Sequence, residues 1–253
     1  PPERTARKGA ASEAYLIGLL GLEEMVRWWS DRSRTASEDT RSAARQVVAY
    51  LRAECEELSA RYGTPLVLHQ SPAETAAHRL AKLDADQFRE EAQQVLAGRS
   101  APYYSNSTWL DTSAPLSVQE RVALEAELHR LMLGRRSTQL WAGEDSPTAA
   151  QLHELLRWAA QDSACRGIAF APEITRCRAC GKMVSGLRSQ CGRCLSDQVD
   201  QWARVGGRML PLAAVNAGAK AEVLARHRGP RQYLDLSQGA RSSARRKRQG
   251  NRR

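Results

Sequence analysis

The chain has 253 residues, a formal net charge of +10, 42% apolar residues and 26% charged residues. This length supports one large domain or two small ones, each with a hydrophobic core. No apolar run approaches the roughly 20 residues that a membrane-spanning helix needs, and no signal-peptide pattern opens the chain, so we expect a protein of the cytoplasm with no membrane partner.

The positive charge is concentrated at the C-terminus. Residues 241–253 contain seven Lys or Arg and no acidic residue, which leaves 10 − 7 = +3 for the other 240 residues. We therefore predict a disordered basic tail over residues 229–253. Such a tail either remains solvated or binds RNA or DNA weakly through the phosphates.

The first part of the chain predicts two helices. An apolar run leads into a helix that carries Glu23 and Glu24 near its start. Over residues 38–62, apolar residues recur in steps of three and four, which is typical of an amphipathic helix, and Gly63 is expected to end it. Cys55 lies on the apolar face and is interpreted as a core residue.

A strand candidate over residues 64–70 runs directly into a helix start. Ser71 is the predicted N-cap, Pro72 the first helical residue, and Glu74 the residue that closes a capping box. A helix N-terminus directs free backbone N–H groups and the positive end of the helix dipole outward, which suits a phosphate group. By itself the pattern is weak evidence of a phosphate site, because most capping boxes only cap a helix.

Helices and strands alternate along the rest of the chain, without an internal repeat. This alternation favours the α/β class. A polar segment is followed by "APYYSNSTWL" at 101–110, with paired tyrosines and an Asn in a Ser/Thr cluster. The segments expected after it are a helix at 118–133, a strand at 137–144, a helix from Ser146 to about Ala164, a strand at 168–174 and a helix within 215–227.

Four of the six cysteines form one cluster with the spacing C-x2-C-x10-C-x2-C. They are Cys177, Cys180, Cys191 and Cys194. Each C-x2-C turn brings two thiolates together, and two such turns complete the tetrahedron that zinc prefers. Four protein ligands leave no open position for a substrate, so we predict a structural zinc, with an iron–sulfur cluster as the minor alternative. Cys165 lies outside this spacing and is interpreted as structural.

Two segments after the cysteines and three before them resemble one enzyme family. "RVGGRM" at 204–209 and "VNAGAKAEV" at 215–223 are similar to the Arg-Val-x-Gly and Asn-Ala-Gly-Lys segments in the large subunit of anaerobic (class III) ribonucleotide reductases, which are glycyl radical enzymes. The resembling segments upstream are "IGLLGLEEMV" at 17–26, "SPAETAAHRLAKLD" at 71–84 and "YYSNS" at 103–107. All five follow the family's order beside the cysteine cluster, which makes the resemblance specific to the C-terminal part of that subunit.

The resemblance implies the C-terminal part of a ten-stranded α/β barrel over residues 1–174, a zinc ribbon over 175–198, and a glycyl radical loop with a closing helix over 199–228. Alignment with the family motif makes Gly207, and not Gly206, the radical-bearing residue. Glycine suits this role because an unpaired electron on Cα is delocalised only when the centre is planar, and a side chain would crowd that plane. The residues implied to bind substrate phosphates are Ser71, Ala73, Glu74 and Thr75.

The resemblance further implies anaerobic reduction of ribonucleoside triphosphates to deoxyribonucleoside triphosphates, a step that supplies DNA replication. A partner activase with S-adenosylmethionine and an iron–sulfur cluster would form the Gly207 radical, and formate or a redoxin would supply electrons. The family's finger-loop cysteine and N-terminal regulatory domain have no counterpart here, and the chain begins with Pro1. We therefore expect a piece of a longer protein, or a subunit that forms a homodimer or pairs with a chain carrying the rest of the barrel.

Two alternatives remain open from the sequence. A zinc-ribbon protein that binds nucleic acid would account for the basic tail, although the rest of the chain is close to neutral. A non-catalytic relative of the reductases, retained for assembly or regulation, would keep the zinc site without forming a radical at Gly207.

Overall fold

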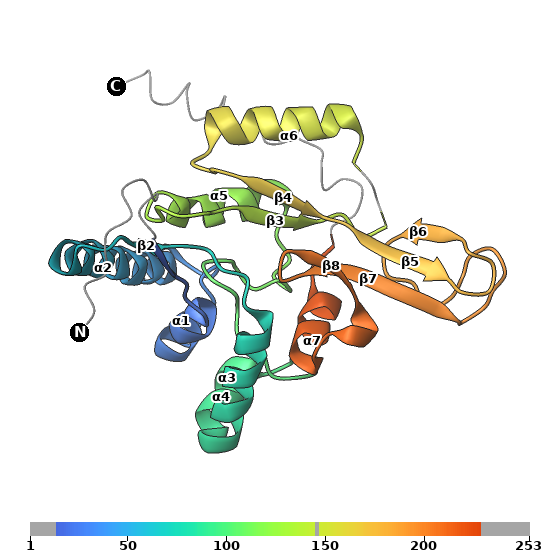
Figure 1. The fold of residues 1–253 in the computed structure, drawn as a ribbon, viewed down its shortest axis with the longest axis horizontal. Helices are drawn as coiled ribbons and strands as arrows, with labels where there is room; N and C mark the ends of the chain where they lie inside the picture. The colour runs from blue at the N-terminus through green and yellow to red at the C-terminus, as the bar shows by residue number, and fades with distance from the viewer. Residues whose placement is uncertain (1–13, 145–146, 229–253) are drawn as a thin grey trace, which may run out of the picture.

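The computed structural model describes residues 14–144 and 147–228, which form helices on several sides of three small sheets (Figure 1). The helices are α1 (Leu22–Ser30), α2 (Glu38–Tyr62), α3 (Glu74–Gln87), α4 (Arg89–Leu96), α5 (Val118–His129), α6 (Ala149–Asp162) and α7 (Ala217–Ala225), with a 3-10 helix η1 at Leu212–Ala214. The strands are β1 (Tyr15–Ile17), β2 (Leu66–Leu68), β3 (Thr138–Trp141), β4 (Ile168–Ala171), β5 (Glu173–Cys177), β6 (Met183–Ser185), β7 (Val199–Val205) and β8 (Arg208–Pro211). The predicted basic tail at 229–253 lies outside the described residues.

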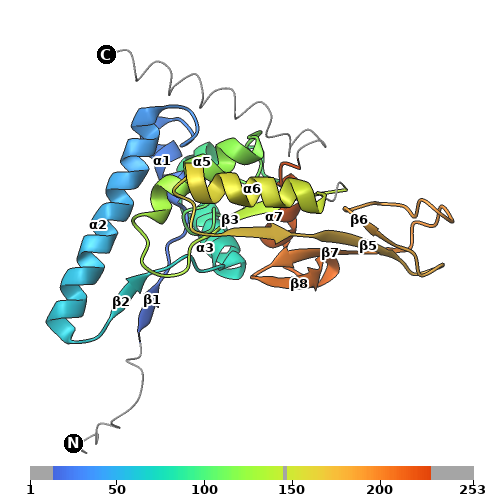
Figure 2. The ribbon, with the colours of Figure 1, turned by 90° about the horizontal axis from the view of Figure 1, so that it is seen from above.

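The sheets differ in strand direction. β1 pairs with β2 and β3 pairs with β4, both in parallel, while β6, β5, β7 and β8 form an antiparallel sheet in that order. The antiparallel sheet projects from the helical part of the molecule, and α2 lies at the opposite end (Figure 2). The mixture of helix and sheet confirms the predicted α/β class in its coarse form. Two parallel pairs of strands cannot close a barrel, so the ten-stranded barrel stays a prediction.

Helix α2 has the predicted boundaries. The Ser37 hydroxyl accepts a hydrogen bond from the Thr40 backbone N–H, and the helix ends at Gly63, whose φ of 64° is left-handed. The apolar face of α2 packs on α1, β2 and α5, and Cys55 is buried there, as predicted. The buried residues of this core cluster are Leu22, Val26, Ala44, Val48, Cys55, Leu68, Leu128 and Met132.

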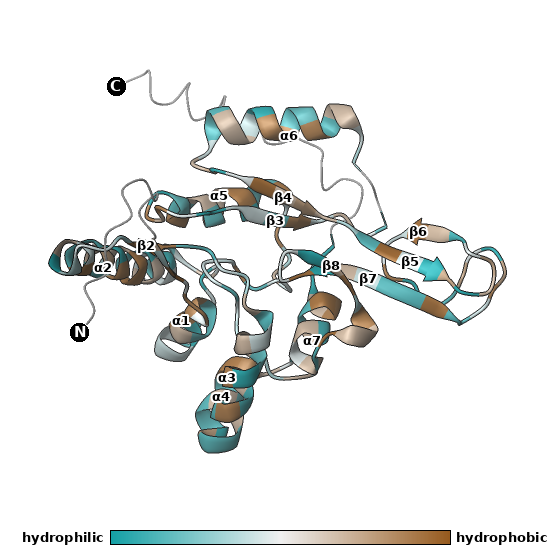
Figure 3. Ribbon diagram, viewed as in Figure 1, coloured by the Kyte–Doolittle hydropathy of each residue, from teal (hydrophilic) through white to brown (hydrophobic). Residues whose placement is uncertain are grey.

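A second apolar cluster joins α5, the β3–β4 pair and α6. Helix α6 lies over these two strands, and β4 is largely apolar (Figure 3). The buried residues of this cluster are Val118, Val122, Leu140, Leu155 and Ala159, and Cys165 packs against them. Within the described part of the chain, no helix combines the length and the apolar character needed to span a membrane.

The strand predicted at 168–174 is two strands in different sheets. Pro172 separates β4 from β5, because proline has no backbone N–H to donate to a neighbouring strand. β4 pairs with β3, whereas β5 pairs with β6 and β7. The helix predicted from Ser146 begins at Ala149 with Thr148 as its N-cap, and Ser146 lies outside the described residues.

The helix start predicted at Ser71 is wrong. Helix α3 begins at Glu74, and its N-cap residue is Ala73, whose side chain makes no capping hydrogen bond. The Ala73 backbone N–H donates to Asn106 Oδ1 at 2.9 Å, and the Ser71 hydroxyl lies 3.1 Å from His69 Nδ1. A contact from a distant segment therefore replaces the local capping pattern.

Helix α5 buries a histidine that should make stability depend on pH. His129 is fully buried, its Nδ1 accepts the Arg166 backbone N–H at 3.2 Å, and burial lowers its pKa to about 4. The folded chain therefore binds fewer protons at His129 than the unfolded chain, in which a histidine titrates near pH 6.5. The stabilisation is complete above about pH 6.5 and is lost as the pH falls towards 4, with a limit of roughly 3 kcal/mol.

We expect the free energy of unfolding to fall by roughly 3 kcal/mol more in the wild type than in His129→Gln when the pH is lowered from 7 to 4. Glutamine keeps an acceptor for the Arg166 N–H but does not titrate. Urea denaturation of both proteins at the two pH values measures the difference. Parallel pH dependence would contradict a buried neutral imidazole at this position.

Candidate functional site

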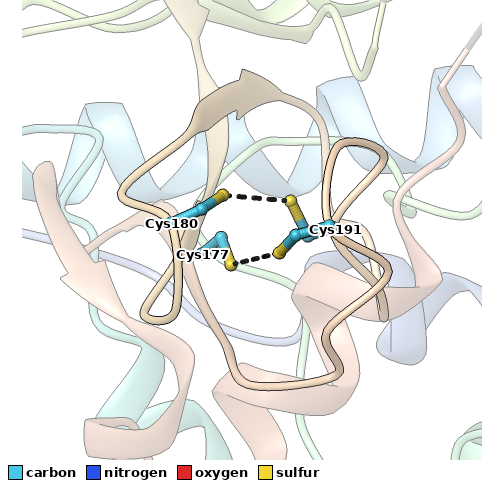
Figure 4. Close-up of side chains that lie close together, drawn as sticks. Cys177, Cys180 and Cys191 are labelled. Atoms are coloured by element: carbon cyan, nitrogen blue, oxygen red, sulfur yellow. Dashed lines mark hydrogen bonds between the residues drawn. The ribbon is translucent and has the colours of Figure 1, made fainter.

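The four clustered cysteines come together in the two turns that flank β6. Their sulfur atoms lie within 4.8 Å of one another. The Sγ atoms of Cys177 and Cys194 are 3.6 Å apart, and those of Cys180 and Cys191 are 3.7 Å apart (Figure 4). A tetrahedral zinc with Zn–S bonds of about 2.3 Å places its ligands ~3.8 Å from one another. The four thiols therefore fit a zinc ion and fill its coordination shell.

Backbone hydrogen bonds close each C-x2-C turn in the same way. The Gly181 N–H donates to the Cys177 carbonyl, and the Leu195 N–H donates to the Cys191 carbonyl, both at 3.0 Å. Gly181 and Leu195 both have left-handed φ values, 71° and 57°. The backbone N–H groups of Cys194 and Arg193 lower the pKa of the Cys191 thiol, whereas hydrogen bonding among the neighbouring thiols raises the pKa of Cys194.

Zinc content tests this site directly. We expect the wild type to retain zinc during dialysis against a mild chelator, and Cys180→Ser to lose it, because the serine hydroxyl is a poor substitute for a thiolate ligand. Cys165→Ser is the matched control, since Cys165 lies outside the cluster and should leave zinc in place. Elemental analysis of the three proteins gives the result. Equal zinc in both variants would contradict the four-cysteine site.

The two neighbouring glycines form the turn of a β-hairpin. Val205, at the end of β7, pairs with Arg208, at the start of β8, so Gly206 and Gly207 are the two turn residues. Their φ values are 59° and 78°, and two consecutive left-handed residues are what a tight type I′ hairpin requires. A Cβ at Gly207 would meet no described heavy atom within 4 Å. Backbone conformation, and not crowding by this chain, therefore accounts for both glycines.

Strand β7 carries the metal site at one end and the glycine turn at the other. Val199, its first residue, pairs with Cys177, whereas Val205, its last, directly precedes the turn. At about 3.3 Å per residue, the strand separates the two sites by ~20 Å. The metal site is therefore remote from Gly207, which fits a structural role for the metal.

Among the residues predicted to bind substrate phosphates, Glu74 reaches the glycine turn. Its Oε1 accepts a hydrogen bond from the Gly206 N–H at 2.9 Å, although 132 positions separate the two residues. Burial raises the pKa of Glu74, and the Gly206 N–H partly opposes this effect. Ser71 and Ala73 lie in the loop before α3, and Thr75 is exposed. The fold thus places the segment predicted to bind phosphates beside the one predicted to carry the radical.

Three of the resembling segments meet next to this contact. The Glu24 carboxylate accepts hydrogen bonds from the Ser105 N–H at 3.0 Å and from its hydroxyl at 2.7 Å, and the Gly21 N–H donates to the Ser105 carbonyl at 2.9 Å. Asn106, which holds the loop before α3, also forms a β-bridge with Leu20. No local pattern in the sequence predicts these contacts, and the shared resemblance of the three segments to one family is the signal that connects them.

Comparison with known proteins assigns this arrangement to a family. The family model of the anaerobic ribonucleoside-triphosphate reductases matches residues 2–228. The chain belongs to this family. A search of the curated proteins found no match.

Solved reductase structures share the fold. One anaerobic ribonucleotide reductase is 24% identical, with a TM-score of 0.64 over 79% of this chain and 30% of that chain. The Thermotoga maritima anaerobic ribonucleotide reductase with MES in the active site is 24% identical, with a TM-score of 0.63 over 80% of this chain and 33% of that chain. The structure of that reductase with dATP bound in the specificity site gives 23% identity and a TM-score of 0.63 over 80% and 33% of the two chains. The reductase chain thus spans about a third of the length of these relatives.

Helix α7 of the reductase chain packs closely against α3 through a glycine. The Asn216 side chain caps α7 by accepting the Ala219 N–H at 2.8 Å. A Cβ at Gly218 would lie 2.5 Å from His78 Nδ1 in α3, which no folded chain tolerates without movement. The resembling segment at 215–223 therefore has a packing role that brings α7 beside the glycine hairpin.

A buried arginine just after α7 holds the base of that hairpin. Arg226 donates two hydrogen bonds to Glu222 at 3.1 Å and one to the Arg204 carbonyl at 3.0 Å. Its guanidinium also lies 3.6 Å from Glu173 and 5.3 Å from the centre of the Trp141 ring. Sequence analysis did not assign Arg226, because a single arginine in a helical pattern normally faces solvent.

A small cavity lies beside Glu74, Glu222 and Arg226. Its volume of about 20 Å³ has room for about one water molecule. The charged residues that line it are Glu74, Arg99, Asp111, Glu222 and Arg226. These charged side chains share the lining with aromatic residues that include Tyr103, Trp109 and Trp141.

Proposed function

We propose that this chain supplies the radical-bearing glycine and the structural zinc site of an anaerobic ribonucleoside-triphosphate reductase. One observation carries the proposal: in a chain of this family, the Gly206–Gly207 turn follows the four-cysteine site and is bonded at 2.9 Å to Glu74 of the segment predicted to bind substrate phosphates. Gly207 would store the radical, and the zinc held by the four thiolates would fix the two turns around it without entering the reaction.

The proposed reaction begins when an activase, using S-adenosylmethionine and an iron–sulfur cluster, removes a hydrogen atom from the Gly207 Cα. The radical passes to a cysteine in a part of the reductase outside this chain, and the resulting thiyl removes the 3′ hydrogen of the ribose. The 2′ hydroxyl leaves as water, and formate or a redoxin supplies the two electrons. Open space beside Gly207 supports the approach of a partner group, since the position of a Cβ there is free of described atoms within 4 Å.

We place the substrate triphosphate at the start of α3. This 14-residue helix directs its first backbone N–H groups, at Glu74 and Thr75, away from the helix body, and an anion is favoured there. The phosphate-binding site would be completed by the hydroxyls of Ser71 and Thr75 and by the loop at Ala73. The Glu74 carboxylate faces the hairpin and would repel a phosphate, so Glu74 would contribute its backbone N–H alone.

Three further parts of the proposal concern assembly. Residues 1–174 would contribute to a ten-stranded barrel completed by the rest of the reductase, residues 175–198 would form the zinc ribbon, and residues 199–228 the radical loop with its closing helix. The complete enzyme would work in the cytoplasm, as a homodimer or with a second chain that carries the remaining barrel strands. Residues 229–253 would bind nucleic acid weakly.

Electron paramagnetic resonance tests the proposal. The zinc-loaded reductase is incubated without oxygen with its activase, S-adenosylmethionine and a reductant. A doublet near the free-electron g value is the expected result. A silent spectrum, with zinc bound and an activase shown to cleave S-adenosylmethionine, would contradict the catalytic proposal and favour a non-catalytic relative.

A further inference from the structure

The glycine turn is anchored to the rest of the described structure by one side chain. The Gly206 N–H donates to Glu74 Oε1 at 2.9 Å, and Glu74 Oε2 lies 3.6 Å from the position that a Cβ on Gly206 would take. The corresponding position on Gly207 has no described heavy atom within 4 Å. Arg226 and the β5–β7 pairing hold the base of the hairpin, and Glu74 is the described side chain that holds its turn.

The Glu74 backbone is itself held in place. Glu74 is the first residue of α3, which packs against α4 and α7, and the loop before it is fixed by the 2.9 Å bond from the Ala73 N–H to Asn106. Its carboxylate lines the small cavity that Glu222 and Arg226 also line, and Arg226 in turn binds the Arg204 carbonyl of β7. The contact thus joins α3 to the β7–β8 hairpin, and each of the two has further contacts of its own.

We infer that Glu74 is a positioning residue for the radical hairpin. Its carboxylate accepts the Gly206 N–H and thereby sets where the neighbouring Gly207 Cα lies relative to α3. This is a task distinct from the phosphate binding implied for the same segment, because it uses the side chain and not the backbone N–H. The inference rests on the proposed function only for the statement that Gly207 carries the radical.

Three substitutions of Glu74 separate its hydrogen bond from its charge. Glu74→Gln loses the negative charge but keeps an acceptor oxygen at the same reach. Glu74→Asp keeps the negative charge at the helix N-terminus, where the charge interacts favourably with the helix dipole, but its side chain is one methylene shorter. Glu74→Ala loses both. Glu90→Ala is the matched control, because Glu90 is also a first-turn glutamate, on the adjacent helix α4, and is exposed.

Hydrogen–deuterium exchange of the zinc-loaded full chain gives the first readout. In Glu74→Ala and Glu74→Asp, we expect the amides of residues 204–209 to exchange about tenfold faster than in the wild type, the effect of losing one charge-assisted hydrogen bond. Exchange in 175–198 and in α2 should not change. Glu74→Gln should stay within about threefold of the wild type, and Glu90→Ala should match it. A purely structural role of Glu74 would not single out the hairpin.

The yield of the glycyl radical after activation gives the second readout, with losses expected in the same two variants and recovery in Glu74→Gln. Exchange requires no radical, activase or substrate, so the two proposals fail separately. Unchanged hairpin exchange in Glu74→Ala and Glu74→Asp would overturn the positioning role, whatever the spectrum shows. Equal acceleration in Glu74→Gln would overturn it in favour of a charge effect. Altered exchange with a silent wild-type spectrum would instead reject the radical function and keep the contact.

Discussion

Gly207→Ala is expected to abolish the glycyl radical while leaving the fold intact, whereas Gly206→Ala should keep the radical. Both glycines have left-handed φ values, 59° and 78°, so alanine costs roughly 1 kcal/mol of backbone strain at either position. Neither alanine meets a steric obstacle: the nearest described atom is Glu74 Oε2, 3.6 Å from a Cβ on Gly206, and none lies within 4 Å at Gly207. The two variants are therefore matched in strain and packing and differ in the residue that the family motif assigns to the radical.

Two measurements distinguish these variants. The doublet in the electron paramagnetic resonance spectrum should be absent from Gly207→Ala and present in Gly206→Ala. Brief exposure of the activated protein to air should cut the wild type and Gly206→Ala at residue 207, and leave Gly207→Ala whole on a denaturing gel. A doublet that persists in Gly207→Ala, or that disappears from Gly206→Ala alone, would place the radical elsewhere and contradict the alignment with the family motif.

Arg226→Ala should lower the free energy of unfolding by about 3–5 kcal/mol, the cost of breaking a buried ion pair from one side. The Arg226 side chain is 2% exposed, and its removal leaves Glu222 without a described cationic partner. Glu173 keeps its pairing with Arg228. The stacking of the guanidinium on Trp141, 5.3 Å from the ring centre, would also be lost.

Urea denaturation at pH 7 measures this effect, and Arg52→Ala is its control. Arg52 pairs with Glu56 at 2.8 Å on the surface of α2, where both side chains are at least a third exposed, so its loss should cost less than about 1 kcal/mol. Arg226→Lys should be intermediate, since lysine keeps the charge but not the paired hydrogen bonds to Glu222. Similar costs for Arg226→Ala and Arg52→Ala would show that the buried network contributes little.

Local sequence patterns correctly predicted the elements that are determined by residues close together in the chain. The steps of three and four over residues 38–62, with Gly63 after them, predicted α2 to the residue. The cysteine spacing predicted four thiols at metal-binding distance, because each C-x2-C turn is closed by its own backbone. The prediction for the start of α3 was wrong because a distant residue is involved. Asn106, 33 positions away from Ala73, accepts the hydrogen bond that fixes the loop before the helix.

The sequence predicted several residues of the candidate site, but it did not predict the contacts between them. The resemblance to the reductases named Gly207 and Glu74, and the fold brings their segments together. The bond between Glu74 and Gly206 joins residues 132 positions apart, and no periodicity or spacing reports such a contact. The same holds for Arg226, which contacts Glu173 of β5 and the Trp141 ring of β3, both distant in sequence.

Strand β7 links the metal site at one of its ends to the glycine hairpin at the other. Slipping β7 by one residue against β5 would exchange its two faces and would shift the β7–β8 hairpin, with its glycine turn, along β5. A metal bound by Cys177, which pairs with Val199, would fix the alignment of the two strands at the far end. From ~20 Å away, the metal would thus fix where the hairpin turn lies along β5, although it touches neither glycine.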